Sequence, residues 1–123
     1  MRIISFSKKL IPPLVAGRKT VTRRAWKTNP YVVGDWAQAW AGSPRNGGRR
    51  VGYVFIRKIE KEPLGWIRDF YEKDELQKEG GLWKTATEFI QDVQTMSPGI
   101  GDRHDVFRLE ISFFRRLPRG VLR

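Results

Sequence analysis

The stretch GRKTVTRR, at residues 17–24, carries a high density of positive charge for so short a segment. Four of its eight residues are cationic, namely Arg18, Lys19, Arg23 and Arg24. No acidic residue precedes Asp35, so nothing nearby in the sequence offsets the repulsion among these side chains. Arginine and lysine both bind phosphate groups through their charge and their N–H donors. The segment therefore indicates a phosphate-rich ligand.

The formal net charge of +11 is unevenly distributed along the chain. Residues 1–58 hold 13 Lys and Arg against one acid, residues 59–112 hold 7 against 12, and residues 113–123 hold four arginines. Such a division predicts one positively charged face, as in proteins that bind nucleic acid. A solvated surface that only maintains solubility is the alternative. Because the cations are interleaved with Trp and Gly, we expect nucleic acid, with RNA first and single-stranded DNA second.

Three basic regions supply the candidate contacts to nucleic acid. Besides residues 17–24, these are the loop SPRNGGRR at 43–50 and the tail RRLPRG at 115–120, both suited to following a phosphate backbone. Trp26 is the preferred residue for stacking on a base, because its strand neighbours are polar. The candidate contacts are Arg18, Lys19, Arg23, Arg24, Trp26, Arg45, Arg49, Arg50, Arg115 and Arg116.

The composition argues against several other classes of site. With no cysteine and a single histidine, His104, the chain lacks the ligands of a zinc site, and we expect no metal and no cofactor. His104 is a candidate acid–base group of a ribonuclease, although a lone loop histidine is more often a surface residue. No apolar run of 18 residues or more is present, and residues 1–10 lack the long apolar stretch typical of a secretory signal. We therefore expect a cytoplasmic protein without membrane contact, and the sequence leaves its oligomeric state undefined.

The periodicity of apolar residues predicts an α+β domain. Alternating patterns predict strands at about residues 2–7, 19–26, 35–41, 49–59 and 106–114. Helices are predicted at about residues 11–16 and 85–96, with one or two short ones within 63–81. Thr85 and Glu88 fit the capping box of the helix at 85–96. We expect a small mixed β-barrel of about five or six strands with two or three peripheral helices. The domain would span residues 1–114, followed by a basic tail at 115–123.

Three segments, taken in order, resemble a known family. GRKTVTRR, VVGDWAQAWA and DVFRLEISFF are similar to the ASCH domain of the PUA-like superfamily, whose members place a Gly-x-Lys-Thr-x-x-x-Arg segment after a strand and a short helix. Gly34 and Asp35 occupy the turn that leads into the next barrel strand in that family. The resemblance covers nearly the whole chain. It implies a PUA-like β-barrel whose cleft is lined by the Lys-Thr-Arg segment and handles nucleic acid or nucleosides.

The resemblance also implies a catalytic set. Some bacterial relatives are amidohydrolases that remove an acetyl group from N-acetylcytidine, and other members are reported as ribonucleases or nucleic-acid binders. The amidohydrolases use a Lys, a Thr three residues later and a Glu from the helical insertion. Lys19 and Thr22 match the first two positions. Glu79 is the preferred third residue, with Glu75 and Glu72 as competitors, and Arg24 matches the Arg that ends the motif.

Lys19 and Thr22 can act together only under one structural condition. Residues three apart on a regular strand point to opposite faces, so Lys19 must still belong to the turn after Gly17. The neighbouring arginines would then lower the pKa of Lys19, which as a free amine would take a proton from Thr22 or water. Arg24 would stabilise the resulting oxyanion.

The alternative is that Lys19 stays charged and holds phosphate, with Thr22 an ordinary strand residue. The sequence favours this reading, so the predicted function is nucleic-acid binding by a basic cleft. Hydrolysis of RNA or of an acetylated cytidine is the alternative function. A third is a protein-interaction module whose acidic middle docks a basic partner.

Overall fold

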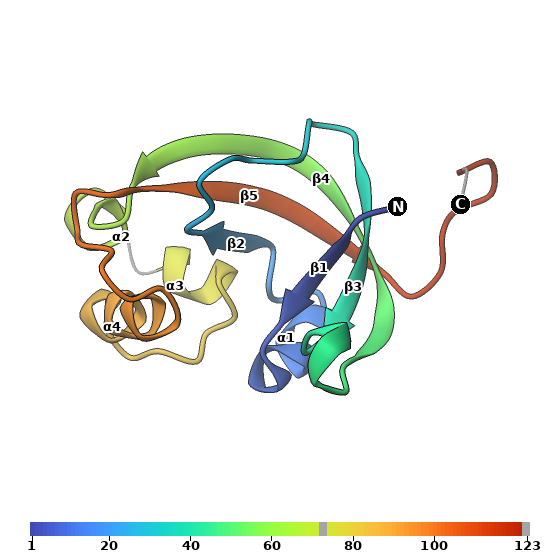
Figure 1. Cartoon of the computed structure of the whole chain (residues 1–123), viewed down its shortest axis with the longest axis horizontal. Coiled ribbons are helices and arrows are strands. Elements are labelled where there is room, and N and C mark those ends of the chain that lie inside the picture. The colour runs from blue at the N-terminus through green and yellow to red at the C-terminus, as the bar shows by residue number, and fades with distance from the viewer. Residues whose placement is uncertain (72–73, 122–123) are drawn as a thin grey trace.

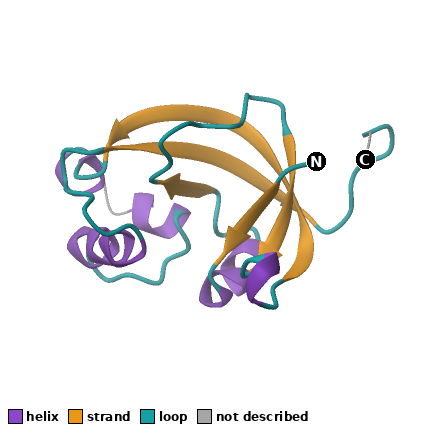
Figure 2. Ribbon diagram, in the orientation of Figure 1, coloured by secondary structure: helices purple, strands orange, loops and turns teal. Residues whose placement is uncertain are grey.

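The computed structural model describes residues 1–71 and 74–121, which form an α+β fold around one mixed sheet (Figures 1 and 2). The strands are β1 (Ile3–Phe6), β2 (Val21–Arg24), β3 (Trp36–Ala41), β4 (Arg49–Pro63) and β5 (Asp105–Phe114). The α-helices are α1 (Ile11–Val15), α2 (Trp66–Asp69), α3 (Asp74–Lys78) and α4 (Ala86–Met96). Two 3₁₀ turns are η1 (Lys8–Leu10) and η2 (Pro44–Asn46). In these described ranges the α-helices number four, because the segment at 63–81 forms the two short helices, α2 and α3, that its sequence allowed.

The five strands follow the order β1-β3-β4-β5-β2. The β1–β3 pair is parallel and the other pairs are antiparallel, so the sheet is mixed as predicted. Strands β4 and β5 form long arcs that carry the sheet around into a half-barrel (Figure 1). Register shifts at Ala39/Trp40 and at Ile56/Lys58 mark irregularities that favour this bending. The curled sheet of five strands confirms the predicted α+β class with a barrel-like sheet.

The inner face of the curl is filled by small and branched side chains. Strand β3 points Ala37, Ala39 and Ala41 inward, while Trp36 and Trp40 on its other face are only half-buried. None of the five tryptophans is fully buried, because the narrow interior admits Ala, Val and Ile more readily. The main core comprises Ile4, Phe6, Leu14, Tyr31, Ala37, Ala39, Val54, Ile56, Leu109 and Ile111.

A second, smaller core lies where helices α2, α3 and α4 pack near the ends of β4 and β5 (Figure 1). It comprises Leu64, Ile67, Leu76, Phe89, Ile90, Val93 and Val106. Thr85 accepts a hydrogen bond from the Glu88 amide at 3.2 Å, which confirms the predicted cap of α4. Trp66, Phe70 and Met96 are exposed, because α2 has only four residues and α4 ends at Met96.

The chain after β5 leaves the sheet at the end opposite α2 and α4 (Figure 1). Leu117 is buried, whereas its neighbours Arg115 and Arg116 are exposed. Within the described residues, no helix has both the length and the apolar character needed to cross a bilayer.

Candidate functional site

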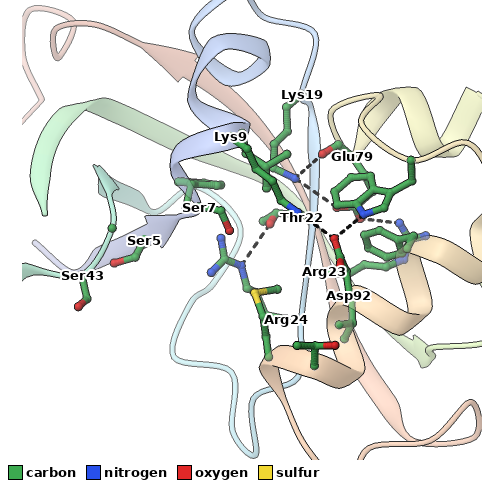
Figure 3. Close-up of a pocket in the computed structure, with 18 of the residues that line it drawn as sticks. Ser5, Ser7, Lys9, Lys19, Thr22, Arg23, Arg24, Ser43, Glu79 and Asp92 are labelled. Atoms are coloured by element: carbon green, nitrogen blue, oxygen red, sulfur yellow. Dashed lines mark hydrogen bonds and ion pairs between the residues drawn. The ribbon is translucent and has the colours of Figure 1, made fainter. Parts of the chain in front are cut away.

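A cleft of about 550 Å³ lies between the curled sheet and the helical half of the molecule. Its walls come from β1 and η1, the start of β2, the loop before η2, and helix α4 (Figure 3). Three of its lining residues are the predicted catalytic set of Lys19, Thr22 and Glu79, and Arg24 lines it as well. The structure thus brings together residues that are separated by up to 60 positions in the sequence.

Lys19 lies just before strand β2, as the catalytic hypothesis requires. Gly17 has a φ of +80°, and the amides of Arg18 and Lys19 both donate to the Pro13 carbonyl, so this segment is a tight turn at the end of α1. Strand β2 begins only at Val21. Lys19 and Thr22 therefore do not share a regular strand, and both reach the same cleft.

The ammonium group of Lys19 is enclosed by acceptors. Its Nζ donates to the Val21 carbonyl at 2.6 Å, to the Glu79 carbonyl at 2.9 Å and to Glu79 Oε1 at 3.2 Å. Burial lowers the pKa of Lys19 more than the charge of Glu79 raises it, and Arg24 and Arg23 lower it further. The direction of this shift agrees with the sequence prediction. The main cause differs, because desolvation outweighs the like charge that the sequence suggested.

Thr22 and Arg24 form the part of the cleft floor next to Lys19. The Nε of Arg24 donates to Thr22 Oγ1 at 3.2 Å (Figure 3). Because the threonine oxygen accepts this bond, its own hydrogen remains available for donation to a base. The guanidinium carbon of Arg24 lies 4.9 Å from the Phe6 ring centroid. Burial lowers the pKa of Arg24 to about 10, and no carboxylate among the described residues pairs with it.

Glu79 reaches the site because the end of α3 is tied to the start of β2. The Thr20 amide donates to the Lys78 carbonyl at 2.8 Å, which places Glu79 beside Lys19. Gly80 follows with a φ of +131°, and a Cβ at this position would lie 2.8 Å from a methyl carbon of Leu10. A glycine is required for this close approach of the chain to η1.

Arg23 also borders the cleft, and its guanidinium is buried in a group of carboxylates. Its two terminal nitrogens pair with Glu79 and Glu75 at 2.7 Å each, and with Glu62 at 3.5 Å. Arg108 on β5 adds a second cation, which donates to Glu75 at 2.7 Å. The hydrogen bonds of these arginines outweigh the effect of burial on Glu75 and lower its pKa. Glu75 therefore stays ionised at neutral pH.

One side of the cleft carries residues that sequence reasoning missed. Lys9 on η1 pairs with Asp92 on α4 at 2.9 Å, and Asp92 also accepts a hydrogen bond from the Trp83 indole at 2.7 Å (Figure 3). Ser5 and Ser43 line the cleft too. The only sequence feature that pointed to this wall of the cleft was the predicted, capped helix α4. Its polar residue Asp92 lies four positions after Glu88.

The fold can be compared with solved structures. PH0355, a hypothetical protein, superposes with a TM-score of 0.70 at 15% identity, over 93% of this chain and all of that one. The ASCH protein from Zymomonas mobilis gives 0.59 at 15% identity, over 93% of this chain and 67% of that one. EF3133 from Enterococcus faecalis, of family DUF984, gives 0.68 at 12% identity, over 93% and 76%. The chain has an ASCH-type fold. No family model and no curated protein sequence matches it.

Within this ASCH fold, the predicted phosphate contacts are scattered. Arg18 is exposed but does not line the cleft, and Trp26 packs half-buried against Tyr31 and Phe107 rather than offering a free face to a base. Arg23 does not fit a phosphate contact, because its side chain is fully buried among carboxylates. The remaining basic candidates, Arg45, Arg49, Arg50, Arg115 and Arg116, are exposed.

Two further sequence candidates lie elsewhere in the ASCH fold. His104 accepts a hydrogen bond from the Gly101 amide at 2.7 Å through Nδ1, so it closes a loop and does not line the cleft. Of the acids that compete with Glu79, Glu75 is buried behind it and Glu72 lies outside the described residues. Among the residues that the structure describes, no group of His, Cys, Asp and Glu is arranged to hold a metal ion.

Proposed function

We propose that this chain is an ASCH domain protein and that its cleft is the active site of a hydrolase that cleaves an amide on a modified nucleoside. The observation that carries the proposal is the convergence of Lys19, Thr22 and Glu79 on one cleft, with Lys19 desolvated. An amine in this setting is activated as a base. A volume of about 550 Å³ is in the range of sites for single small ligands.

The reaction would begin at Thr22. The neutral amine of Lys19 accepts the Oγ1 proton as Oγ1 attacks the amide carbonyl carbon, and Arg24 holds Oγ1 through its Nε. The charge on the carbonyl oxygen is stabilised by the guanidinium of Arg24, as the sequence suggested. When the C–N bond breaks, Lys19 returns the proton to the leaving nitrogen. Water then hydrolyses the acyl-threonine, which restores Thr22 and releases the acid.

Glu79 has a supporting part in this scheme. Its carboxylate lies between Lys19 and Arg23, and its backbone carbonyl accepts a second hydrogen bond from Lys19. These contacts hold the amine in one position in the cleft that Thr22 also lines. A base that is held in place contributes to catalysis because the reacting groups already have the relative orientation that the reaction requires.

The test is turnover of N-acetylcytidine, with release of cytidine measured by chromatography. Thr22→Ala should lower kcat by about 10³-fold or more, since it removes the nucleophile. Thr22→Ser keeps a hydroxyl and should retain measurable turnover. Thr20→Ala is the matched control, because Thr20 lies two residues away and does not line the cleft.

Two results would count against the proposal. If the wild-type protein forms no cytidine, the amide substrate is wrong. If Thr22→Ala retains the activity of Thr20→Ala, the hydroxyl is not the nucleophile, and attack by a water activated by Lys19 replaces it.

A second candidate function, RNA binding, is favoured by the loop beside the cleft. Ser43 and Asn46 line the cleft, and the exposed side chains of Arg45, Arg49 and Arg50 belong to the same loop or follow it directly. Cations at a cleft entrance can hold the phosphates of a polymer whose base enters it. Replacing the three arginines with Gln should reduce the slope of log affinity against log salt by about 2 to 3 units. An unchanged slope would exclude them as phosphate contacts.

A further inference from the structure

Arg23 occupies an unusual position for a strand residue between two cleft residues. All three residues border the cleft, but the side chain of Arg23 has no exposed surface. Its nitrogens meet carboxylates from β4, from α3 and from the residue after α3, namely Glu62, Glu75 and Glu79. Both terminal nitrogens of Arg23 are already paired with carboxylates, so its effect on the reaction must pass through these partners.

The distances show how the charge of Glu79 is divided. Arg23 Nη1 lies 2.7 Å from Glu79 Oε2, whereas Lys19 Nζ lies 3.2 Å from Glu79 Oε1. The shorter contact is the stronger one, so Arg23 takes the larger share of the carboxylate. Lys19 makes its shorter contacts with two uncharged backbone carbonyls. A lysine whose carboxylate is engaged elsewhere loses its proton more easily.

Arg23 is itself held by Glu75, which also binds Arg108. Glu75 Oε1 accepts from Arg23 at 2.7 Å and from Arg108 at 2.7 Å, so one carboxylate oxygen joins the two arginines. Arg108 in turn pairs with Glu60 on β4 at 3.0 Å and with Glu110 on β5 at 2.7 Å. A continuous chain of ion pairs therefore leads from the long strands to Lys19.

We propose that Arg23 is a positioning residue of the hydrolase, which holds the Glu79 carboxylate and leaves the Lys19 amine free to accept the proton of Thr22. The inference rests on the function proposed above. It gives Arg23, the first arginine of the pair Arg23-Arg24, a role different from the phosphate contact that its sequence context indicates.

The consequence concerns the pH dependence of the reaction. The charged groups that face Lys19 are Glu79, Arg24 and Arg23. Removing Arg23 removes a positive charge and leaves the full charge of Glu79 to Lys19, and both changes favour the ammonium form. The limb of the rate profile that requires the free amine should then move to higher pH. Removing the charge of Glu75 instead leaves Arg23 to pair more strongly with Glu79. The ammonium form of Lys19 is then less stabilised, so the limb should move to lower pH.

The experiment compares Arg23→Gln, Arg23→Lys and Glu75→Gln with the wild type in the kcat profile on N-acetylcytidine. Arg23→Gln should raise the midpoint of the basic requirement by about one pH unit, with KM little changed. Arg23→Lys should recover much of the shift, because it keeps the charge. Arg57→Gln is the matched control, since Arg57 is exposed on β4 and does not line the cleft.

A direct readout separates this inference from the proposed function. The ¹⁵N resonance of Lys19 Nζ, assigned with Lys19→Gln, reports its titration whether or not the protein turns over N-acetylcytidine. Opposite shifts in Arg23→Gln and Glu75→Gln would support the inference even if the wild type has no amidase activity. The inference is overturned if neither variant moves the Lys19 titration, or if both move it in the same direction. Should Arg23→Gln not fold, Glu75→Gln and Arg23→Lys still decide the outcome.

Discussion

Replacing Glu79 with Gln tests the buried charge network at its centre. The substitution keeps the size of the side chain and one carbonyl oxygen, but it removes the charge that Lys19 and Arg23 share. One of the two cations would then face an amide NH₂, which is a donor and cannot accept its hydrogen bond. Glu79 is almost fully buried, so water cannot take the place of the lost acceptor.

The expected loss in the free energy of unfolding follows from the contacts that remain. Removing one partner of a buried ion pair costs about 3–5 kcal/mol. Lys19 keeps two backbone carbonyls as acceptors, and Arg23 keeps Glu75 at 2.7 Å. We therefore expect the lower end of the range, about 3 kcal/mol at neutral pH. A domain of ordinary stability, about 5–15 kcal/mol, would survive this loss in folded form.

Urea denaturation followed by tryptophan fluorescence measures the effect, with Glu60→Gln as control. Glu60 belongs to the same network through Arg108 but is exposed, so its replacement should cost less than about 1 kcal/mol. If Glu79→Gln lowers the free energy of unfolding no more than Glu60→Gln does, the buried ion pairs of Glu79 do not stabilise the fold as their distances indicate.

The penalty of Glu79→Gln should also depend on pH. The folded-state pKa of Lys19 lies below its unfolded value of 10.5, so the folded form binds fewer protons and stability falls as pH falls between the two values. Loss of Glu79 lowers the folded pKa further. The penalty should be largest at pH values below the folded pKa of Lys19 in the variant, and should shrink as pH rises through the folded pKa of the wild type, which lies below 10.5. A penalty that grows with pH would refute this assignment.

Two further substitutions test the geometry around the cleft. Gly80→Ala should destabilise the protein by about 1–3 kcal/mol in thermal unfolding, because its φ of +131° and the contact with Leu10 disfavour a side chain. Asp92→Asn should cost less than about 1 kcal/mol, because Lys9 and Asp92 are both largely exposed and the amide oxygen can still accept from Trp83. A loss above 2 kcal/mol, on the order of a buried pair, would mean that this contact joins the two halves of the fold.

Local sequence pattern predicted most of the elements. The strand at 35–41 alternates strictly and was observed at Trp36–Ala41, and the capped helix predicted at 85–96 begins at Ala86. Strand β4 continues to Pro63, four residues beyond its predicted end, because Lys61 and Glu62 pair with β5. That pairing is a long-range contact that no local pattern contains. The same holds for α2 and α3, where the apolar residues at 63–81 suggested more burial than two short helices provide.

The charge pattern was interpreted less well than the fold. The basic first half and the acidic middle indicated one positive face. Inside the protein, however, cations of the first half form ion pairs with carboxylates of the middle. Arg23 meets Glu75 and Glu79, which lie 52 and 56 residues later. Nothing in the sequence of residues 17–24 distinguishes the buried Arg23 from Arg18, which is exposed. The convergence of Lys19 and Thr22 was easier to predict, because it depends only on a turn at Gly17.

The location of the buried charges bears on the choice between catalysis and binding. The buried charged side chains among the described residues are Lys19, Arg23, Arg108, Glu62, Glu75 and Glu79. They form one group at and behind Lys19 and Thr22. A network that served stability alone could be replaced by apolar residues of similar volume at little cost. A polymer binder would gain nothing from enclosing Lys19 and Arg23, because phosphate contacts require accessible cations. An enzyme that must keep an amine desolvated beside a hydroxyl does require such a group, and this supports chemistry ahead of binding at this cleft.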